Sequence, residues 1–203
     1  MGGVEDGNAM SETDTTERTG QVGTPAARLP GDPSPQDAIA RMIRVDHAGE
    51  YGARRIYEGQ LAVLGGTAGA ESVRHMYQQE LRHLEAFDRL MAERRVRPTA
   101  LQPLWHLAGF ALGATTALLG EKAAMACTVA VEEVIDQHYA GQVAALGAEE
   151  AALKDTLEEF RAEELEHRDL ALKHGAREAP GYEVLSTAIK AGSRLAIWLS
   201  ERI

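Results

Sequence analysis

Two short motifs place a carboxylate and an imidazole three residues apart. The first pairs Glu80 with His83, and the second pairs Glu164 with His167. On a helix, side chains at positions i and i+3 lie on the same face, so each pair could bind one metal ion. One such motif alone is a weak signal, because in a glutamate-rich chain it could equally be a solvated charged face. The presence of two motifs makes the pattern informative.

A glutamate precedes each motif by the length of a helical hairpin. Glu50 lies 30 residues before Glu80, and Glu132 lies 32 residues before Glu164. An antiparallel helix pair would return the chain to the same level along the helix axes, so each upstream glutamate would lie beside its motif. Both upstream glutamates lie among small or apolar residues, where an unpaired carboxylate is costly. We therefore predict one buried metal site with six ligands: Glu50, Glu80, His83, Glu132, Glu164 and His167.

The chemistry of these ligands favours two iron or two manganese ions. Four carboxylates offset most of the charge of two divalent ions, and oxygen donors with two imidazoles suit iron or manganese better than zinc. One glutamate from each of two helices, plus a Glu-x-x-His motif from each of two others, is the ligand set of ferritin-like di-iron bundles. The single cysteine, Cys127, excludes a thiolate cluster or a disulfide within the chain and is expected to serve packing.

Four further polar residues are candidates for roles beside the metals. Tyr57 and Tyr139 each follow the upstream glutamate of their half by seven residues, close to the same helix face. They are predicted to hydrogen-bond a ligand carboxylate or the substrate, or else to be core tyrosines. Tyr139 and His138 are the predicted catalytic residues, His138 for proton transfer. Asp46 could orient a ligating histidine or lie on the surface.

Helices must position all of these residues. Ser34 suits a helix N-cap and Pro35 the first helical position, whereas glycine or proline follows each expected helix end. No stretch alternates apolar and polar residues as a strand would. We predict an all-α fold over residues 34–203: a ferritin-like four-helix bundle with an apolar crossover helix and a short C-terminal helix. The expected helices cover 35–64, 70–95, 101–119, 121–146, 149–174 and 182–203.

Residues 1–33 are predicted to form a disordered acidic tail, because they are rich in Gly, Thr, Glu and Asp. They lack an Arg-rich amphipathic pattern and an apolar signal stretch, which indicates a bacterial protein on the cytoplasmic side. The net charge of −10 argues against nucleic-acid binding.

The segment 98–120 contains no Asp, Glu, Lys or Arg, and it is long enough to span a bilayer. Spanning would put the two helix pairs on opposite sides, and the six ligands could not meet. A crossover along the bundle is therefore expected. Arg94, Arg95 and Arg97 before it and Trp105 within it favour attachment to a membrane surface. A buried core or an oligomer interface is the alternative.

Four stretches of the chain resemble the demethoxyubiquinone hydroxylases of ubiquinone biosynthesis, with the likeness extending over residues 35–203. The resemblance implies a di-iron monooxygenase that uses O2 to hydroxylate the ring of a polyprenyl demethoxy-benzoquinol. It implies that the six ligands bind iron and that NADH or the quinol is the reductant. The glycines that flank Glu50 would leave room for the ring. It also implies peripheral attachment to the cell membrane and, as candidate partners, other ubiquinone-biosynthesis proteins or a second copy of the chain. The four stretches are 44–53, 95–99, 125–133 and 163–167.

Two other functions remain open on the residues alone. One is a different ferritin-like oxidase, such as a ferroxidase or a manganese catalase. The other is a non-catalytic, membrane-associated helical scaffold for quinone enzymes.

Overall fold

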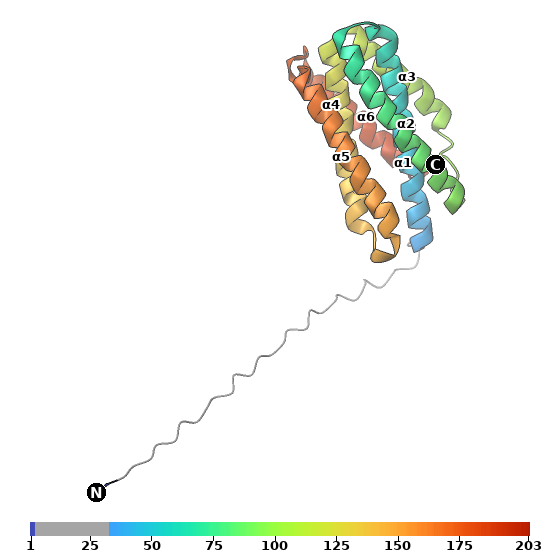
Figure 1. Ribbon diagram of the computed structural model, residues 1–203. Helices are drawn as coiled ribbons and strands as arrows, with labels where there is room; N and C mark the ends of the chain where they lie inside the picture. The colour runs from blue at the N-terminus through green and yellow to red at the C-terminus, as the bar shows by residue number, and fades with distance from the viewer. Residues whose placement is uncertain (3–32) are drawn as a thin grey trace. The chain divides into compact units, whose positions relative to one another are not determined.

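The chain folds into helices in the computed structural model, which describes residues 1–2 and 33–203 apart from the side chain of Ala68 (Figure 1). No strand occurs among these residues, and the predicted all-α bundle is confirmed. The tail predicted over 1–33 lies almost wholly outside the described residues, so the division into tail and bundle stays a prediction. The helices are α1 (Pro35–Leu64), α2 (Ala68–Arg94), α3 (Gln102–Leu118), α4 (Glu121–Ala145), α5 (Ala151–Lys173) and α6 (Tyr182–Ser200).

Helix α1 begins at the predicted cap. The Ser34 hydroxyl accepts a hydrogen bond from the Asp37 backbone N–H at 3.0 Å, and the Asp37 carboxylate accepts one from the Ser34 N–H at 3.2 Å. This reciprocal pair satisfies two amides that the first turn leaves free. The helix ends at Gly65, whose φ of 52° is a conformation that glycine adopts without strain.

The helices form three layers. Two hairpins, α1 with α2 and α4 with α5, make the four-helix bundle, and α1 and α4 also contact each other. Helices α3 and α6 pack on the outer side of α1 and α4. The apolar segment therefore runs along the bundle as predicted. None of the described helices is long and apolar enough to cross a membrane.

Glycines bring the backbones of α1 and α3 into direct contact. A Cβ atom added to Gly113 would lie 1.9 Å from the Ile56 carbonyl oxygen, and one added to Gly59 would lie 2.2 Å from the Phe110 carbonyl oxygen. Any larger residue at these positions would push the two helices apart.

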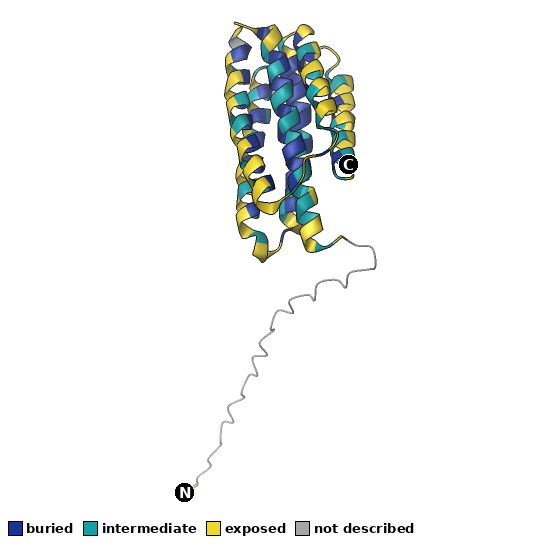
Figure 2. Ribbon diagram, turned by 90° about the vertical axis from the view of Figure 1, so that its right-hand side faces the viewer, coloured by how far each residue is buried: buried dark blue, intermediate teal, exposed yellow. Residues whose placement is uncertain are grey.

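The core has apolar clusters on either side of a polar centre. One includes Tyr57, Met76 and Met125, and another includes Phe87 and Leu157. Along α1, α2, α4 and α5, the six predicted ligands lie between the residues of these clusters. Figure 2 shows the buried residues on the inward faces of the helices and the exposed residues outside. The bundle therefore buries the six predicted ligands in a largely apolar interior.

Candidate metal centre

The six predicted ligands meet in the middle of the bundle, although they come from four helices. Glu50 lies on α1, Glu80 and His83 lie on α2, Glu132 lies on α4, and Glu164 and His167 lie on α5. None of the six is more than 3% exposed. Their donor atoms form two groups, each with all atoms within 4.8 Å of one another.

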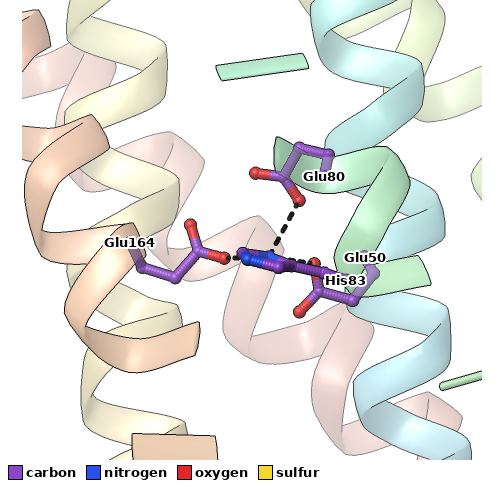
Figure 3. Close-up of side chains that lie close together, drawn as sticks. All are labelled: Glu50, Glu80, His83 and Glu164. Carbon is purple, nitrogen blue, oxygen red and sulfur yellow. Dashed lines mark ion pairs between the residues drawn. The ribbon is translucent and has the colours of Figure 1, made fainter. Parts of the chain in front are cut away.

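The first group contains Glu50, Glu80, His83 and Glu164 (Figure 3). The His83 Nδ1 atom lies 3.1 Å from a Glu164 oxygen, 3.3 Å from a Glu50 oxygen and 3.9 Å from a Glu80 oxygen. One imidazole nitrogen therefore faces three carboxylates. We call this group the His83 position.

The second group contains Glu80, Glu132, Glu164 and His167. The His167 Nδ1 atom lies 3.0 Å from the other Glu164 oxygen and 3.3 Å from the other Glu80 oxygen. We call this group the His167 position. Glu80 and Glu164 belong to both groups, so each could bridge a pair of ions.

These side chains fit metal ions better than they fit one another. Five of their buried donor atoms have no hydrogen-bond partner within the described chain, and charged groups without partners are rare in protein interiors. A pair of divalent cations would satisfy these atoms and offset the crowded negative charge. The five atoms are Glu50 Oε2, both Glu80 oxygens, His83 Nδ1 and Glu132 Oε2.

The metal-free site is electrostatically strained. Burial, followed by the charge of Glu164, raises the pKa of Glu80 and of Glu132 well above the usual range. Burial acts against the charged form of His83, but the nearby carboxylates of Glu50 and Glu164 raise its pKa to about 12. Burial also disfavours the charged form of Glu164, yet the adjacent imidazoles of His167 and His83 lower its pKa to about 2. Without cations, burial and the neighbouring carboxylate thus favour the neutral forms of Glu80 and Glu132.

Two buried tyrosines hold ligand carboxylates across the two halves of the bundle. The Tyr57 hydroxyl donates to Glu132 Oε1 at 2.8 Å, and the Tyr139 hydroxyl donates to Glu50 Oε1. The predicted hydrogen bond to a ligand carboxylate is therefore present for both tyrosines. Each tyrosine bonds the glutamate of the opposite half rather than its own.

The prediction for Asp46 was wrong in both of its alternatives. Asp46 is buried, and it accepts hydrogen bonds from His138 Nε2 at 3.1 Å and from Gln142 Nε2 at 2.8 Å. It therefore bonds no ligating histidine and does not lie on the surface. Burial raises the pKa of Asp46. Burial works against a charged His138, but Asp46 raises the pKa of that imidazole.

Sequence reasoning missed the partners of the outer histidine nitrogens. His83 Nε2 bonds Glu163 Oε2 at 2.7 Å, and His167 Nε2 bonds Gln79 Oε1 at 3.0 Å. Gln79 and Glu163 each directly precede the glutamate of a Glu-x-x-His motif. That equivalent placement in the two halves was the signal that could have found them. Cys127 is fully buried as expected, and burial raises its pKa to about 12.

An apolar cavity of about 370 Å³ lies between α1, α3, α4 and α6. Gly49 and Gly52 line it, and they flank the ligand Glu50 on α1. A Cβ added to Gly52 would meet nothing within 4 Å, and one added to Gly49 would meet only Ile135 at 3.7 Å. Helix packing does not require glycine here, so these two positions leave space in the cavity, which none of the six predicted ligands lines.

Comparison with known proteins gives consistent matches. The sequence model of a family described as "Ubiquinone biosynthesis protein COQ7" matches residues 37–200. The chain is 64% identical over 177 residues to the 3-demethoxyubiquinol 3-hydroxylase of Rhodospirillum rubrum, covering 87% of this chain and 84% of the relative. It is 55% identical over 170 residues to the human mitochondrial NADPH-dependent 3-demethoxyubiquinone 3-hydroxylase, covering 82% and 78%. It is 44% identical over 182 residues to the mitochondrial 5-demethoxyubiquinone hydroxylase of Saccharomyces cerevisiae, covering 81% and 78%.

Proposed function

Because the chain belongs to the COQ7 family of ubiquinone biosynthesis proteins, we propose that it is a 3-demethoxyubiquinol 3-hydroxylase with a di-iron centre. The reaction replaces a ring C–H bond of the quinol by C–OH. One oxygen atom of O2 enters the product, and the other leaves as water with two protons and two electrons from a reductant. The observation that carries the proposal is the pair of overlapping ligand groups that share Glu80 and Glu164 in a buried core.

Six side chains would hold the irons. Glu50 and His83 would bind one ion, Glu132 and His167 would bind the other, and Glu80 and Glu164 would serve both. Bound iron supplies the redox chemistry that reduces O2. Tyr57 and Tyr139 fix the carboxylates of Glu132 and Glu50, so each keeps its second oxygen directed at the centre.

The apolar cavity would bind the quinol ring and the start of its isoprenoid tail. Its lining is mostly apolar, and Gly49 and Gly52, which lie next to Glu50 in the sequence of α1, would leave room for the ring. A volume of about 370 Å³ lies within the range typical of small-molecule sites. The rest of the tail would remain in lipid.

His138 would carry protons toward the centre. Its side chain is 16% exposed, and its Nε2 atom contacts the buried Asp46. Asp46 precedes Glu50 by one helical turn on α1. We propose that His138 takes a proton from solvent at Nδ1 and passes its Nε2 proton to Asp46, one helical turn from Glu50.

A membrane surface would supply the lipid substrate. Helices α3 and α6 expose large apolar side chains, with Leu107 69% and Leu195 56% exposed. Of the three arginines before α3, Arg94 pairs with Glu150, so Arg95 and Arg97 would meet the lipid headgroups. The proposed location is the cytoplasmic face of a bacterial membrane, with other ubiquinone-biosynthesis proteins or a second copy as partners.

The reductant in this proposal is a reduced nicotinamide or the quinol itself. The name of the human relative describes that enzyme as NADPH-dependent. Anaerobic mixing of the ferric protein with each donor in turn would identify the one that reduces it.

Turnover with labelled oxygen tests the function. The iron-loaded protein, a demethoxyubiquinol and a reductant are mixed under ¹⁸O2, and the product is analysed by mass spectrometry. One ¹⁸O atom per hydroxylated ring is expected. Oxidation of added ferrous iron without any hydroxylated quinol would indicate a ferroxidase. A protein that binds no metal and gives no product would be a scaffold.

A further inference from the structure

The approximate twofold repeat of the metal centre is broken at the partners of the outer histidine nitrogens. Both halves contribute a glutamate, a Glu-x-x-His motif and a tyrosine bonded to the opposite glutamate. The residue that receives the outer N–H of the ligating histidine differs between the halves. It is Glu163 for His83 and Gln79 for His167.

The carboxylate partner makes the more strongly charged contact. The distance from His83 Nε2 to Glu163 Oε2 is 2.7 Å, whereas that from His167 Nε2 to Gln79 Oε1 is 3.0 Å. Arg82 also bonds both oxygens of Glu163, at 3.1 and 3.2 Å, and keeps the carboxylate oriented toward the ring. Hydrogen bonds to an ionised acceptor are shorter and about twice as strong as those between neutral groups.

A carboxylate on one imidazole nitrogen makes the other nitrogen a stronger metal ligand. It draws the proton away from the ring, and the electron density at the opposite atom rises. In this chain the opposite atom is Nδ1, which faces the carboxylates of the centre in both histidines. Gln79 lacks the negative charge and cannot have the same effect on His167.

Resting on the proposed metal centre, we propose that Glu163 makes the His83 position the tighter of the two metal sites, so that it fills first. Glu163 is thus a positioning residue that acts through His83. The two positions would bind iron with different affinities, although each position has the same kinds of direct ligands.

Cobalt binding to the full-length protein measures this difference without turnover. The metal-free protein is titrated anaerobically with Co²⁺ alone and followed by calorimetry and visible absorption. The wild-type protein is expected to bind two ions in unequal steps. Glu163→Gln should weaken the tighter step by about 10-fold or more and change the weaker step much less. Gln79→Glu should tighten the weaker step.

The reciprocal exchange gives the strongest readout. At one equivalent of Co²⁺, the metal shifts the proton resonance of the Nε2–H of the histidine that binds it. That histidine should be His83 in the wild-type protein and His167 in the double variant Glu163→Gln/Gln79→Glu. A merely structural role for Glu163 would not reverse the order.

Two variants serve as controls. Glu166→Gln removes an equal charge from an exposed position of the same helix, and Arg82→Gln removes the arginine but keeps the carboxylate on His83. Both should leave the His83 position the tighter one. Two bound ions with equal affinities in the wild-type protein, or equal weakening of both steps in Glu163→Gln, would overturn this inference alone. A wild-type protein that binds no Co²⁺ would overturn the metal centre itself.

Discussion

At the scale of residues, the molecule buries six ionisable side chains together in its interior, where a charge is energetically costly. Four buried glutamates and two buried histidines share one small volume, and several of their donor atoms lack partners within the described chain. The sequence was sufficient to predict these six, because a carboxylate among apolar helix residues needs a compensating partner. It was not sufficient to predict Glu163, because a glutamate in a charged helical stretch is ordinarily solvated.

Glu132→Gln should abolish hydroxylation while the protein stays folded. The amide can still accept the hydrogen bond from Tyr57, but it replaces a carboxylate that faces the His167 position. Activity is expected to fall further than the roughly 10- to 100-fold that follows loss of a ligand's partner. Steady-state turnover and circular dichroism measure the two effects.

The neighbouring Glu133→Gln is the matched control for that variant. Glu133 pairs with Lys190 and belongs to neither ligand group, so its substitution should leave turnover nearly unchanged. Wild-type activity in Glu132→Gln would remove Glu132 from the ligand set.

Metal removal should lower the melting temperature, and by a larger amount at higher pH. The pKa values of Glu80 and Glu132 are raised in the metal-free protein, so the stability that their protonated forms provide is present below about pH 4.5 and is lost as pH rises through the raised values. The raised pKa of His83 acts in the same direction above about pH 6.5, whereas the lowered pKa of Glu164 has no further effect above about pH 4.5.

The metal-loaded protein lacks this penalty because the cations offset the charge. Calorimetry of the metal-free and metal-loaded proteins between about pH 5 and pH 8 should therefore show a widening gap. An unchanged melting temperature after chelation would count against a buried cluster.

At the scale of elements, two similar hairpins build the centre together. The sequence predicted the helices closely, because caps, glycines and prolines mark their ends. It placed Tyr57 on the face of Glu50, but the structure pairs Tyr57 with Glu132 of the other hairpin. Seven residues advance a helix by about 10 Å, which carries the hydroxyl past its own glutamate. Only the packing of α1 beside α4 shows which carboxylate it meets.

Gly113→Ala should destabilise the bundle by loosening the contact between α1 and α3. The added Cβ would overlap the backbone of Ile56, and backbone shifts of this kind cost about 1–3 kcal/mol. Urea denaturation measures the change. Gly141→Ala on α4 is the control, since its Cβ meets nothing within 4 Å and alanine favours helices by about 1 kcal/mol. Equal stability of the Gly113→Ala and wild-type proteins would show that α3 does not depend on this contact.

At the scale of the whole bundle, the buried carboxylates and histidines lie among α1, α2, α4 and α5, and a separate apolar cavity lies among α1, α3, α4 and α6. The α2 and α5 layer encloses the centre with α1 and α4, whereas α3 and α6 enclose the cavity and carry exposed leucines. The composition of the α3 segment suggested either a membrane surface or a protein interface. Composition could not distinguish them, because both environments bury apolar side chains alike.

Replacing both Leu107 and Leu195 with glutamine should release the protein from vesicles. Two fully inserted leucines contribute about 3–6 kcal/mol, so the affinity for anionic phospholipid vesicles should fall by more than about 10-fold. Sedimentation with vesicles measures it. Replacing both with isoleucine keeps their hydropathy and should keep binding. Equal vesicle binding by the glutamine variant would reject this face as the attachment site.

The central proposal is that Glu80 and Glu164 each bind to both metal ions. Mössbauer spectroscopy of the anaerobically reduced, ⁵⁷Fe-loaded protein measures it most directly. We expect two high-spin ferrous ions per chain in the wild-type protein and the loss of both in Glu80→Ala, since Glu80 belongs to both positions. A wild-type protein with fewer than two bound ions, or a Glu80→Ala protein that keeps both, would contradict it.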